Sequence, residues 1–323
     1  MKKIGFLVLT FGFLLNSCNC DKKNATNATA QGTEEHFSYV FNNGSDSVRV
    51  EVKKVPEKLA VYSHFATEML MALGLGDKIV LGVREGEVLP EFKEQFEKIP
   101  HQQVGHHSIF SKEQFLLLGI DFVTGWDQSI NQQMTGDANE LLSRGIYPFV
   151  VKSIRDGENL ETVYEDFETL GKIFKVEDKA KEVVDGMKKK LADAKLIQKP
   201  DNEKKKILIF SSIENGLYAS GGLATDLINR AGGKNIYEDL AADHEFVSFE
   251  SAVDRNPDII LISYLAGEDS FEEKVKILKT HPALKDLPAV KNDRIYSIAL
   301  EDIAPGIRNA DFIIKLNKLM YGE

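Results

Sequence analysis

The 323-residue chain has only two cysteines, Cys18 and Cys20, and both lie within its first twenty residues. Residues 37 to 323 therefore contain no cysteine, which excludes an internal disulfide or a thiolate metal site there. The sequence also lacks Gly-x-Ser-x-Gly and His-Glu-x-x-His, the motifs of serine hydrolases and zinc peptidases. No apolar run reaches the about 20 residues that cross a membrane. These absences argue against an enzyme of either class and against a membrane-spanning protein.

The chain has 50 acidic residues against 40 lysines and arginines, which gives a formal net charge of −10 at pH 7. An acidic chain argues against nucleic acid as a partner and against electrostatic docking onto anionic lipid. The part of the chain beyond residue 36 is about 285 residues long. Single hydrophobic cores rarely grow to serve chains of that length, so we expect two domains.

The first residues are typical of an export signal. Two lysines precede an apolar run from Ile4 to Leu15, which is too short to span a membrane. Residues 15 to 18, Leu-Asn-Ser-Cys, resemble the lipobox of bacterial lipoproteins, which implies removal of residues 1–17 and a lipid on Cys18. Residues 18–36 are polar and lack apolar periodicity, so we expect a tether. The protein would then be anchored in the cell envelope, facing the periplasm or the exterior, with an ordinary secretory signal as the alternative.

Strand-like and helix-like segments alternate through the rest of the chain. Residues 37–41 and 48–52 predict a leading hairpin. Beyond it we expect a strand at 59–63 and a helix from 67 to 75 capped by Thr67. Strand–helix alternation predicts parallel sheets with right-handed crossovers.

A long helical stretch, residues 160–174 and 177–197, interrupts this alternation, which restarts at residue 207. We therefore expect an α/β protein with two lobes joined by one long helix. The predicted parts are an N-terminal lobe with its hairpin at 37–157, a helical segment at 158–198 and a C-terminal lobe at 199–323.

In open parallel sheets, ligands bind beyond the carboxyl ends of the strands. The candidate ligand-binding residues at such positions, together with one arginine before the last helix, are Ser63, His64, Arg84, Trp126, Tyr218, Tyr264 and Arg308. Arginine forks match carboxylate or catecholate oxygens, and aromatic rings offer flat faces to a planar ligand. Structural roles remain open for Trp126, which could cover a core edge, and for Tyr218, which could be an ordinary strand residue. His64 could equally be a hydrogen-bonded structural histidine.

Histidine is the remaining candidate for metal binding, since cysteine is excluded. The possible ligands are His64, His106, His107 and His244. An adjacent pair cannot easily face one ion, so at least one of His106 and His107 is expected in a surface loop.

Several segments, residues 55–61, 66–74, 77–83, 231–236 and 287–296, resemble the class III solute-binding proteins of ABC importers. The likeness covers nearly the whole chain beyond the tether. That family serves siderophores, haem, cobalamin and related metal complexes. The resemblance implies two Rossmann-like lobes joined by a single long helix, a monomer without catalytic activity or intrinsic cofactor, and a membrane permease with its ATPase as partner.

The family carries one exposed glutamate per lobe that docks onto arginines of the permease. Residues 111–114, Ser-Lys-Glu-Gln, and 248–251, Ser-Phe-Glu-Ser, match those segments. The resemblance therefore implies docking roles for Glu113 and Glu250. The chain departs from the family at residues 62–65, Tyr-Ser-His-Phe, where a small, polar run is commoner.

Together these features predict a lipid-anchored protein that captures a metal complex between two lobes and delivers it to a permease. An iron–siderophore complex leads, because Arg84 and Arg308 could pair with an anionic chelate and Trp126 could pack on it. Haem, cobalamin and a nickel or other metal chelate remain open as cargo. An extracytoplasmic metalloenzyme and a surface adhesin are the remoter alternatives.

Overall fold

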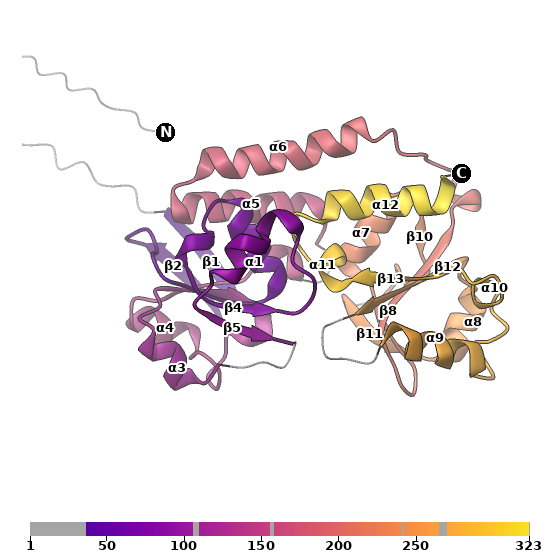
Figure 1. Cartoon of the computed structure of the whole chain (residues 1–323), viewed down its shortest axis with the longest axis horizontal. Helices are drawn as coiled ribbons and strands as arrows, with labels where there is room; N and C mark the ends of the chain where they lie inside the picture. The colour runs from indigo at the N-terminus through magenta and orange to yellow at the C-terminus, as the bar shows by residue number, and fades with distance from the viewer. Residues whose placement is uncertain (1–36, 106–109, 156–157, 241, 265–269, 323) are drawn as a thin grey trace, which may run out of the picture. The chain divides into compact units, whose positions relative to one another are not determined.

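The computed structural model describes residues 37–105, 110–155, 158–240, 242–264 and 270–322. Cys18, His106 and His107 lie outside these residues, as do the expected export signal and tether. Two α/β lobes make up the described chain, the first in indigo to magenta and the second in orange to yellow (Figure 1). No helix in these ranges is both long and apolar enough to cross a membrane.

The N-lobe begins with the predicted hairpin and continues as a five-stranded sheet. In the hairpin, β1 (Phe37–Asn42) and β2 (Ser47–Val52) pair antiparallel. The sheet is parallel throughout, in the order β5-β4-β3-β6-β7. Its strands are β3 (Leu59–Tyr62), β4 (Ile79–Arg84), β5 (His101–Val104), β6 (Phe122–Gly125) and β7 (Tyr147–Phe149). Both faces of the central strand β3 are covered, which explains its uninterrupted apolar sequence.

The first helix begins earlier than its sequence pattern predicts. α1 spans His64–Ala72, and its N-cap is Ser63, whose hydroxyl accepts a hydrogen bond from Ala66 N. The prediction that Thr67 caps it is wrong, because the Thr67 hydroxyl lies inside the helix and donates to Ser63 O. The lobe's other helices are α2 (Lys93–Glu97), α3 (Lys112–Leu117) and α4 (Ala138–Ser143).

The predicted helical segment between the lobes forms two helices, close to the two ranges that the sequence predicts. α5 (Leu160–Phe174) ends at Lys175, which adopts a left-handed conformation with φ 56°, and α6 (Glu177–Asp193) returns alongside it. The helices pack closely at Gly171, where an added Cβ would lie 2.8 Å from the Ala180 side chain. Both helices also contact helices of the C-lobe.

The C-lobe sheet is mixed, although strand–helix alternation predicts a parallel one. Its order is β11-β9-β8-β12-β13, with β10 also paired to β8. β9 runs antiparallel to β8 and β11, because only residues 214–216 separate β8 from β9 and a parallel crossover needs a dozen or more. The strands are β8 (Lys206–Ile213), β9 (Leu217–Ser220), β10 (Lys234–Asn235), β11 (His244–Val247), β12 (Ile259–Tyr264) and β13 (Ile295–Ala299).

Six helices accompany this sheet in the described part of the C-lobe. They are α7 (Gly222–Arg230), α8 (Phe249–Arg255), α9 (Phe271–Thr280), α10 (Pro288–Lys291), α11 (Leu300–Ile303) and α12 (Asn309–Tyr321). α12 also packs against α6, where Lys190 Nζ lies 2.8 Å from Asp311 Oδ2. The predicted α/β class with two lobes is confirmed.

One continuous cluster of buried apolar side chains joins the two lobes. It includes Phe122 of the N-lobe sheet, Met69 of α1, Ile303 of α11 and Ile313 of α12. A second cluster, around Phe210 and other C-lobe side chains, is separate from it. Because protein cores are close-packed, a shared core favours small movements between the lobes over wide opening.

Candidate ligand-binding site

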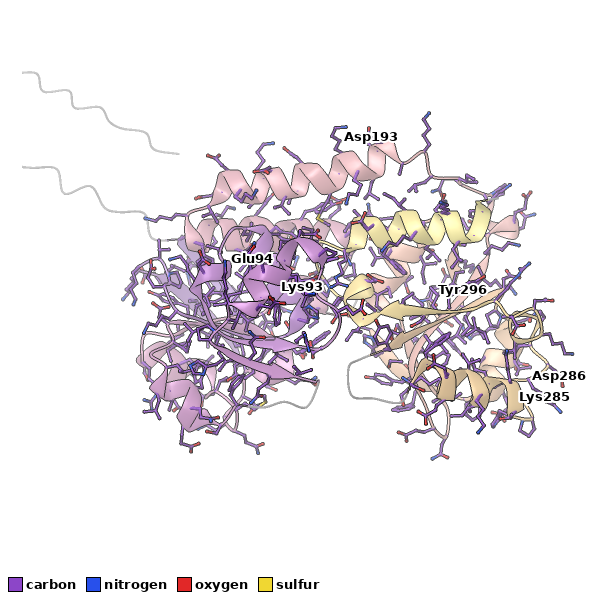
Figure 2. The ribbon with its side chains drawn as sticks, in the orientation of Figure 1. Lys93, Glu94, Asp193, Lys285, Asp286 and Tyr296 are labelled. Atoms are coloured by element: carbon purple, nitrogen blue, oxygen red, sulfur yellow. The ribbon has the colours of Figure 1, made fainter. Side chains whose placement is uncertain are left out.

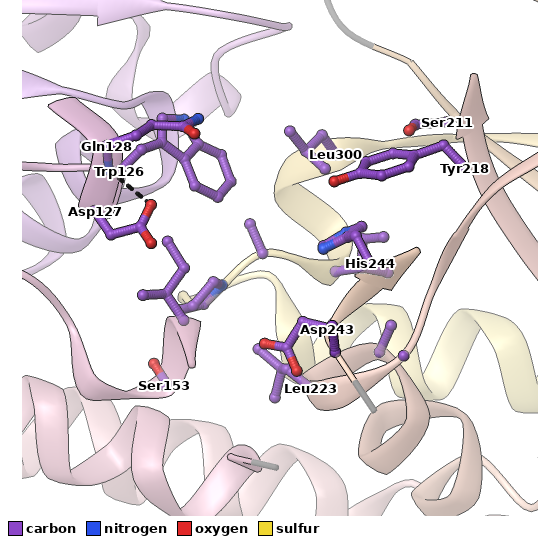
Figure 3. A pocket seen from close by; sticks show the side chains of 17 residues that line it. Trp126, Asp127, Gln128, Ser153, Ser211, Tyr218, Leu223, Asp243, His244 and Leu300 are labelled. Atoms are coloured by element: carbon purple, nitrogen blue, oxygen red, sulfur yellow. Dashed lines mark hydrogen bonds between the residues drawn. The ribbon is translucent and has the colours of Figure 1, made fainter. Parts of the chain in front are cut away.

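A cavity of about 380 Å³ lies between the lobes. Sites for small molecules commonly have volumes of roughly 300–1,000 Å³. Both lobes contribute polar and aromatic side chains to its wall (Figure 3), among them Trp126, Asp127, Gln128, Ser153, Ser211, Tyr218, Asp243 and His244. Three residues expected from the sequence, Trp126, Tyr218 and His244, therefore lie together.

Trp126 is placed by the end of β6. Gly125 has φ +154°, and an added Cβ would lie 2.7–2.9 Å from Tyr62 atoms, so only glycine fits there. The indole Nε1 donates to Glu85 Oε1 at 3.0 Å, and the indole packs edge-on against Phe65 with ring centroids 4.8 Å apart. Trp126 thus covers a core edge and lines the cavity, so both interpretations of its sequence position apply.

The opposite wall is built from two antiparallel strands. Tyr218 lies in β9, and its ring stacks on His244 of β11 at a centroid distance of 5.5 Å and an angle of 21°. Phe246 pairs with Tyr218 in the strand register, and the centroids of their two rings are 4.9 Å apart. β9 and β11 were not predicted from the sequence. His244 and Phe246 are two positions apart, the spacing of side chains on one face of a strand, and this spacing was the signal that could have revealed β11.

Asp243, which was not predicted from the sequence, precedes β11 in this wall. Its carbonyl accepts a hydrogen bond from Gly221 N at 2.6 Å, which fixes the turn beside the start of α7. Gly222 has φ +45°, and a side chain there would overlap the Asp243 carboxylate. The Gly-Gly pair therefore makes room for an acidic group at the cavity.

A buried carboxylate outside the cavity holds the part of the N-lobe wall that contains Ser153. Asp166 of α5 accepts hydrogen bonds from Ser153 Oγ at 2.5 Å, Ser153 N at 2.9 Å and Lys152 N at 2.7 Å. Burial raises the pKa of Asp166 to about 6, although these bonds favour its ionised form. The loop that carries Ser153 is therefore held by a proton-sensitive group outside the cavity wall.

The other ligand-binding candidates do not line this cavity. Ser63 is buried as the cap of α1, Arg84 is exposed at the end of β4, and Tyr264 is partly buried at the end of β12. His64 and Arg308 are buried in a polar network between the lobes. Contact of these five residues with cargo stays a prediction.

That inter-lobe network consists of alternating acids and bases. Arg308 Nε donates to Glu68 Oε2 at 2.7 Å, and its Nη2 donates to Glu68 Oε1 at 2.5 Å and Glu87 O at 2.6 Å. His64 Nδ1 lies 2.8 Å from Glu301 Oε1, and its Nε2 lies 3.4 Å from Glu68 Oε1. Arg308 and Glu301 belong to the C-lobe, so the network ties them to α1.

The network shifts the pKa of its own members. Burial by itself lowers the pKa of His64, but the bonds to Glu301 and Glu68 outweigh it and raise that pKa to about 9. Burial likewise raises the pKa of Glu68, but Arg308 and His64 outweigh it and hold that pKa below its usual value. At neutral pH the histidine is therefore charged.

The two glutamates expected to dock on a permease occupy equivalent local structures. Glu113 and Glu250 are exposed in the first turns of α3 and α8. Each follows a serine N-cap: Ser111 Oγ accepts from Gln114 N, and Ser248 Oγ accepts from Ser251 N. Their docking role stays a prediction.

Metal binding by His64, His106, His107 or His244 stays a prediction. No group of three or more His, Cys, Asp or Glu side chains is arranged there to hold a metal ion. His244 lines the cavity and His64 pairs with two glutamates, while His106 and His107 lie outside the described residues.

The sequence pattern of the family described as "Periplasmic binding protein" matches residues 59–300. The chain belongs to this family. Its members are binding proteins and not enzymes. The chain is 28% identical over 276 residues to the uncharacterized ABC transporter substrate-binding lipoprotein YvrC of Bacillus subtilis (strain 168), covering 83% of this chain and 81% of that protein.

Two further matches span most of the chain. The petrobactin-binding protein YclQ of Bacillus subtilis (strain 168) is 24% identical over 304 residues, covering 91% of this chain and 90% of that protein. The crystal structure of a periplasmic binding protein from Veillonella parvula matches with a TM-score of 0.79 and 26% identity, covering 88% of this chain and 98% of that one. The chain is thus similar to ABC substrate-binding proteins over nearly the whole length of each.

Proposed function

We propose that this periplasmic binding protein captures a metal complex in the inter-lobe cavity and delivers it to the permease of an ABC importer. The observation that carries this proposal is the aromatic lining, with Trp126 on one lobe and Tyr218 stacked on His244 on the other. Relatives and matched structures are named for petrobactin, vitamin B12, haem and ferric hydroxamate. An iron–siderophore complex is the first candidate cargo; haem, a corrinoid or another metal chelate is the alternative.

The aromatic faces suit such cargo because chelates present broad apolar surfaces around a shielded metal. Stacking on an aromatic side chain requires no metal ligand from the protein, so the complex can be captured and released intact. The shared core of the two lobes supports a small closure around the cargo.

Delivery requires a surface that the permease can engage on both lobes. Glu113 and Glu250 are exposed carboxylates, one per lobe, in matching helix first turns. We place the permease contact at these two residues. A lipid on Cys18 and a tether over residues 18–36 would keep the protein near its permease.

Fluorescence offers a direct test, because Trp126 is the only tryptophan of the chain and lines the cavity. Titration of the purified protein with ferric siderophores, haemin and cyanocobalamin should give saturable quenching with at least one of them. Tyr218→Ala should weaken that binding by about tenfold or more, in line with the 1–3 kcal/mol that stacking contributes in other aromatic sites.

A matched control is Tyr296→Ala, which removes a tyrosine from β13 that lies outside the cavity wall (Figure 2). It should bind cargo like the parent protein. Absence of saturable quenching by every complex in the panel would refute the cavity as a metal-complex site.

A further inference from the structure

We infer that Asp166 is a positioning residue of the cargo site, and that cargo binding weakens when its carboxylate takes up a proton. This inference rests on the function proposed above and adds a regulation of the same cavity. Its basis is a short turn of the cavity wall whose first hydrogen-bond donors all meet this one buried carboxylate.

That turn is the short 3₁₀ helix η4 (Lys152–Ile154), which follows β7 and brings Ser153 and Ile154 to the cavity. Figure 3 shows Ser153 on the N-lobe side of this space. The first N–H groups of a helix have no partner inside it. In η4 these are Lys152 N and Ser153 N, and they donate to Asp166 at 2.7 and 2.9 Å.

The hydrogen bonds within the turn are longer than those to the carboxylate. The two backbone bonds donated by Ile154 N and Arg155 N are 3.5 and 3.3 Å long. The Ser153 hydroxyl also donates to Asp166, at 2.5 Å. Three short bonds against two long ones make Asp166 the main anchor of this part of the wall. Because Asp166 is only 3% exposed and does not line the cavity, it acts on cargo through Ser153 and Ile154.

No cation pairs with Asp166 in the part of the chain that the structure describes. Glu165, on the same helix, raises the pKa of Asp166, and Lys152 Nζ lies 3.5 Å from Glu165 and 3.9 Å from Glu158. The helices α6 and α7 and the strand β1 also pack against α5. Among their charged and titratable groups, Lys188 lies over the Tyr164 ring, Arg230 pairs with Asp226 and Glu161, and Tyr39 donates to Pro148 O. None of these groups forms a hydrogen bond or ion pair with Asp166, so its burial and the turn decide its charge state.

Burial raises the pKa of Asp166 to about 6, although the bonds from Ser153 and Lys152 oppose this shift. The group is therefore ionised at pH 7.5 and largely protonated at pH 5. An ionised carboxylate only accepts hydrogen bonds, and bonds to a charged acceptor are about twice as strong as neutral ones. A protonated carboxyl has lost that charge and carries a donor of its own, so it holds η4 less firmly.

A loosened turn should weaken cargo binding, because a binding site needs its wall residues held to within about 0.5 Å. The fold by itself has the opposite preference. Because the pKa of Asp166 is raised from 3.8 to about 6, its contribution to stability is fully present below pH 3.8 and is lost as pH rises through 6. Acidification should therefore stabilise the fold through this group while it weakens cargo binding, and this difference in sign separates a positioning role from a purely structural one.

The test measures the cargo affinity of the parent protein and of Asp166→Asn at pH 7.5 and pH 5 by quenching of Trp126 fluorescence. The probe is the complex, among ferric siderophores, haemin and cyanocobalamin, that saturates the parent protein. The amide group of asparagine points hydrogens at donors that the carboxylate accepts, so Asp166→Asn should bind about tenfold more weakly at pH 7.5. At pH 5 the two proteins should bind the probe with equal affinity.

Comparison of the two proteins removes every pH effect that they share. His244 in the cavity wall and the cargo itself can also titrate, but both are the same in the parent protein and the variant. Asp193→Asn makes the same substitution at the exposed end of α6, outside the cavity wall (Figure 2), and should bind cargo like the parent protein at both pH values.

Each outcome bears on a different claim. Equal affinities at pH 7.5, or a parent-to-variant ratio that is the same at both pH values, would overturn the role of Asp166 while leaving metal-complex binding intact. If circular dichroism shows that Asp166→Asn does not fold, calorimetry of the parent protein in buffers of different ionisation enthalpy decides. Cargo binding at pH 6 should then release protons, and absence of release would overturn the inference. If no complex in the panel binds at either pH, the proposed function fails and this inference fails with it.

Discussion

His64 Nδ1 lies 2.8 Å from Glu301 Oε1, a contact that joins the first helix of the N-lobe to α11 of the C-lobe. Both residues are buried, and Glu68 connects the same histidine to Arg308. Buried ion pairs add little net stability but are strongly destabilising when one partner is removed. We therefore expect this network to fix how the two lobes meet.

The pH dependence of stability should report the His64 contact. Because the pKa is raised to about 9 in the folded protein from an ordinary value of 6.5, the contact stabilises fully below pH 6.5 and is lost as pH rises through 9. The loss should reach roughly 3 kcal/mol in the free energy of unfolding. Urea denaturation between pH 6 and 9.5 measures it.

Histidine variants provide the control for this pH effect. His64→Gln should show a flatter profile in that window, whereas His281→Gln, at the end of α9, should keep the parent slope. Parallel profiles for the parent protein and His64→Gln would contradict the raised pKa.

Removal of Arg308 should be costly because Glu68 would remain buried without its guanidinium partner. Arg308→Met should lower the free energy of unfolding by about 3–5 kcal/mol, and the double variant Glu68→Met/Arg308→Met should recover much of that loss. Lys98→Met breaks an exposed pair with Glu94, which water screens, and should leave the free energy of unfolding almost unchanged. Equal effects of Arg308→Met and Lys98→Met would show that the buried pair is unimportant.

Gly125 should not tolerate a side chain. Gly125→Ala forces a Cβ against Tyr62 at a positive φ, so we expect a loss of more than about 1 kcal/mol and an altered Trp126 emission spectrum. Gly186→Ala is the matched control, because no atom lies within 4 Å of the added Cβ in α6. It should stabilise the protein by about 0.5–1 kcal/mol, the usual gain in a helix interior. Thermal unfolding of both variants tests this contrast.

Charge reversal should separate delivery from capture. Glu113→Lys/Glu250→Lys should abolish cargo uptake by cells while leaving cargo affinity of the purified protein unchanged, since both residues lie outside the cavity wall. The control Glu97→Lys/Glu272→Lys reverses one exposed glutamate on another helix of each lobe. Uptake that survives the first double reversal would place the docking contact elsewhere.

Local sequence patterns were sufficient to predict most of the helices and strands. The hairpin, β3 and α5 appear where the sequence pattern predicts them. β5 was missed because its sequence, His-Gln-Gln-Val, is polar and exposed at a sheet edge. The cap of α1 was misplaced because Ser63 and Thr67 are both good caps, and only the packing of residues 64 to 66 decides between them.

The sequence by itself determined the α/β class with two lobes, the resemblance to the family, and the three aromatic candidates Trp126, Tyr218 and His244 that line the cavity. Only the tertiary structure decided which candidate residues line the cavity and which charged residues pair with each other. Arg308 and Glu68 are 240 positions apart, and no local periodicity records such a pairing. Because a buried charge must find a partner, the fold commits Arg308 and His64 to the joint between the lobes, and neither residue lines the cavity.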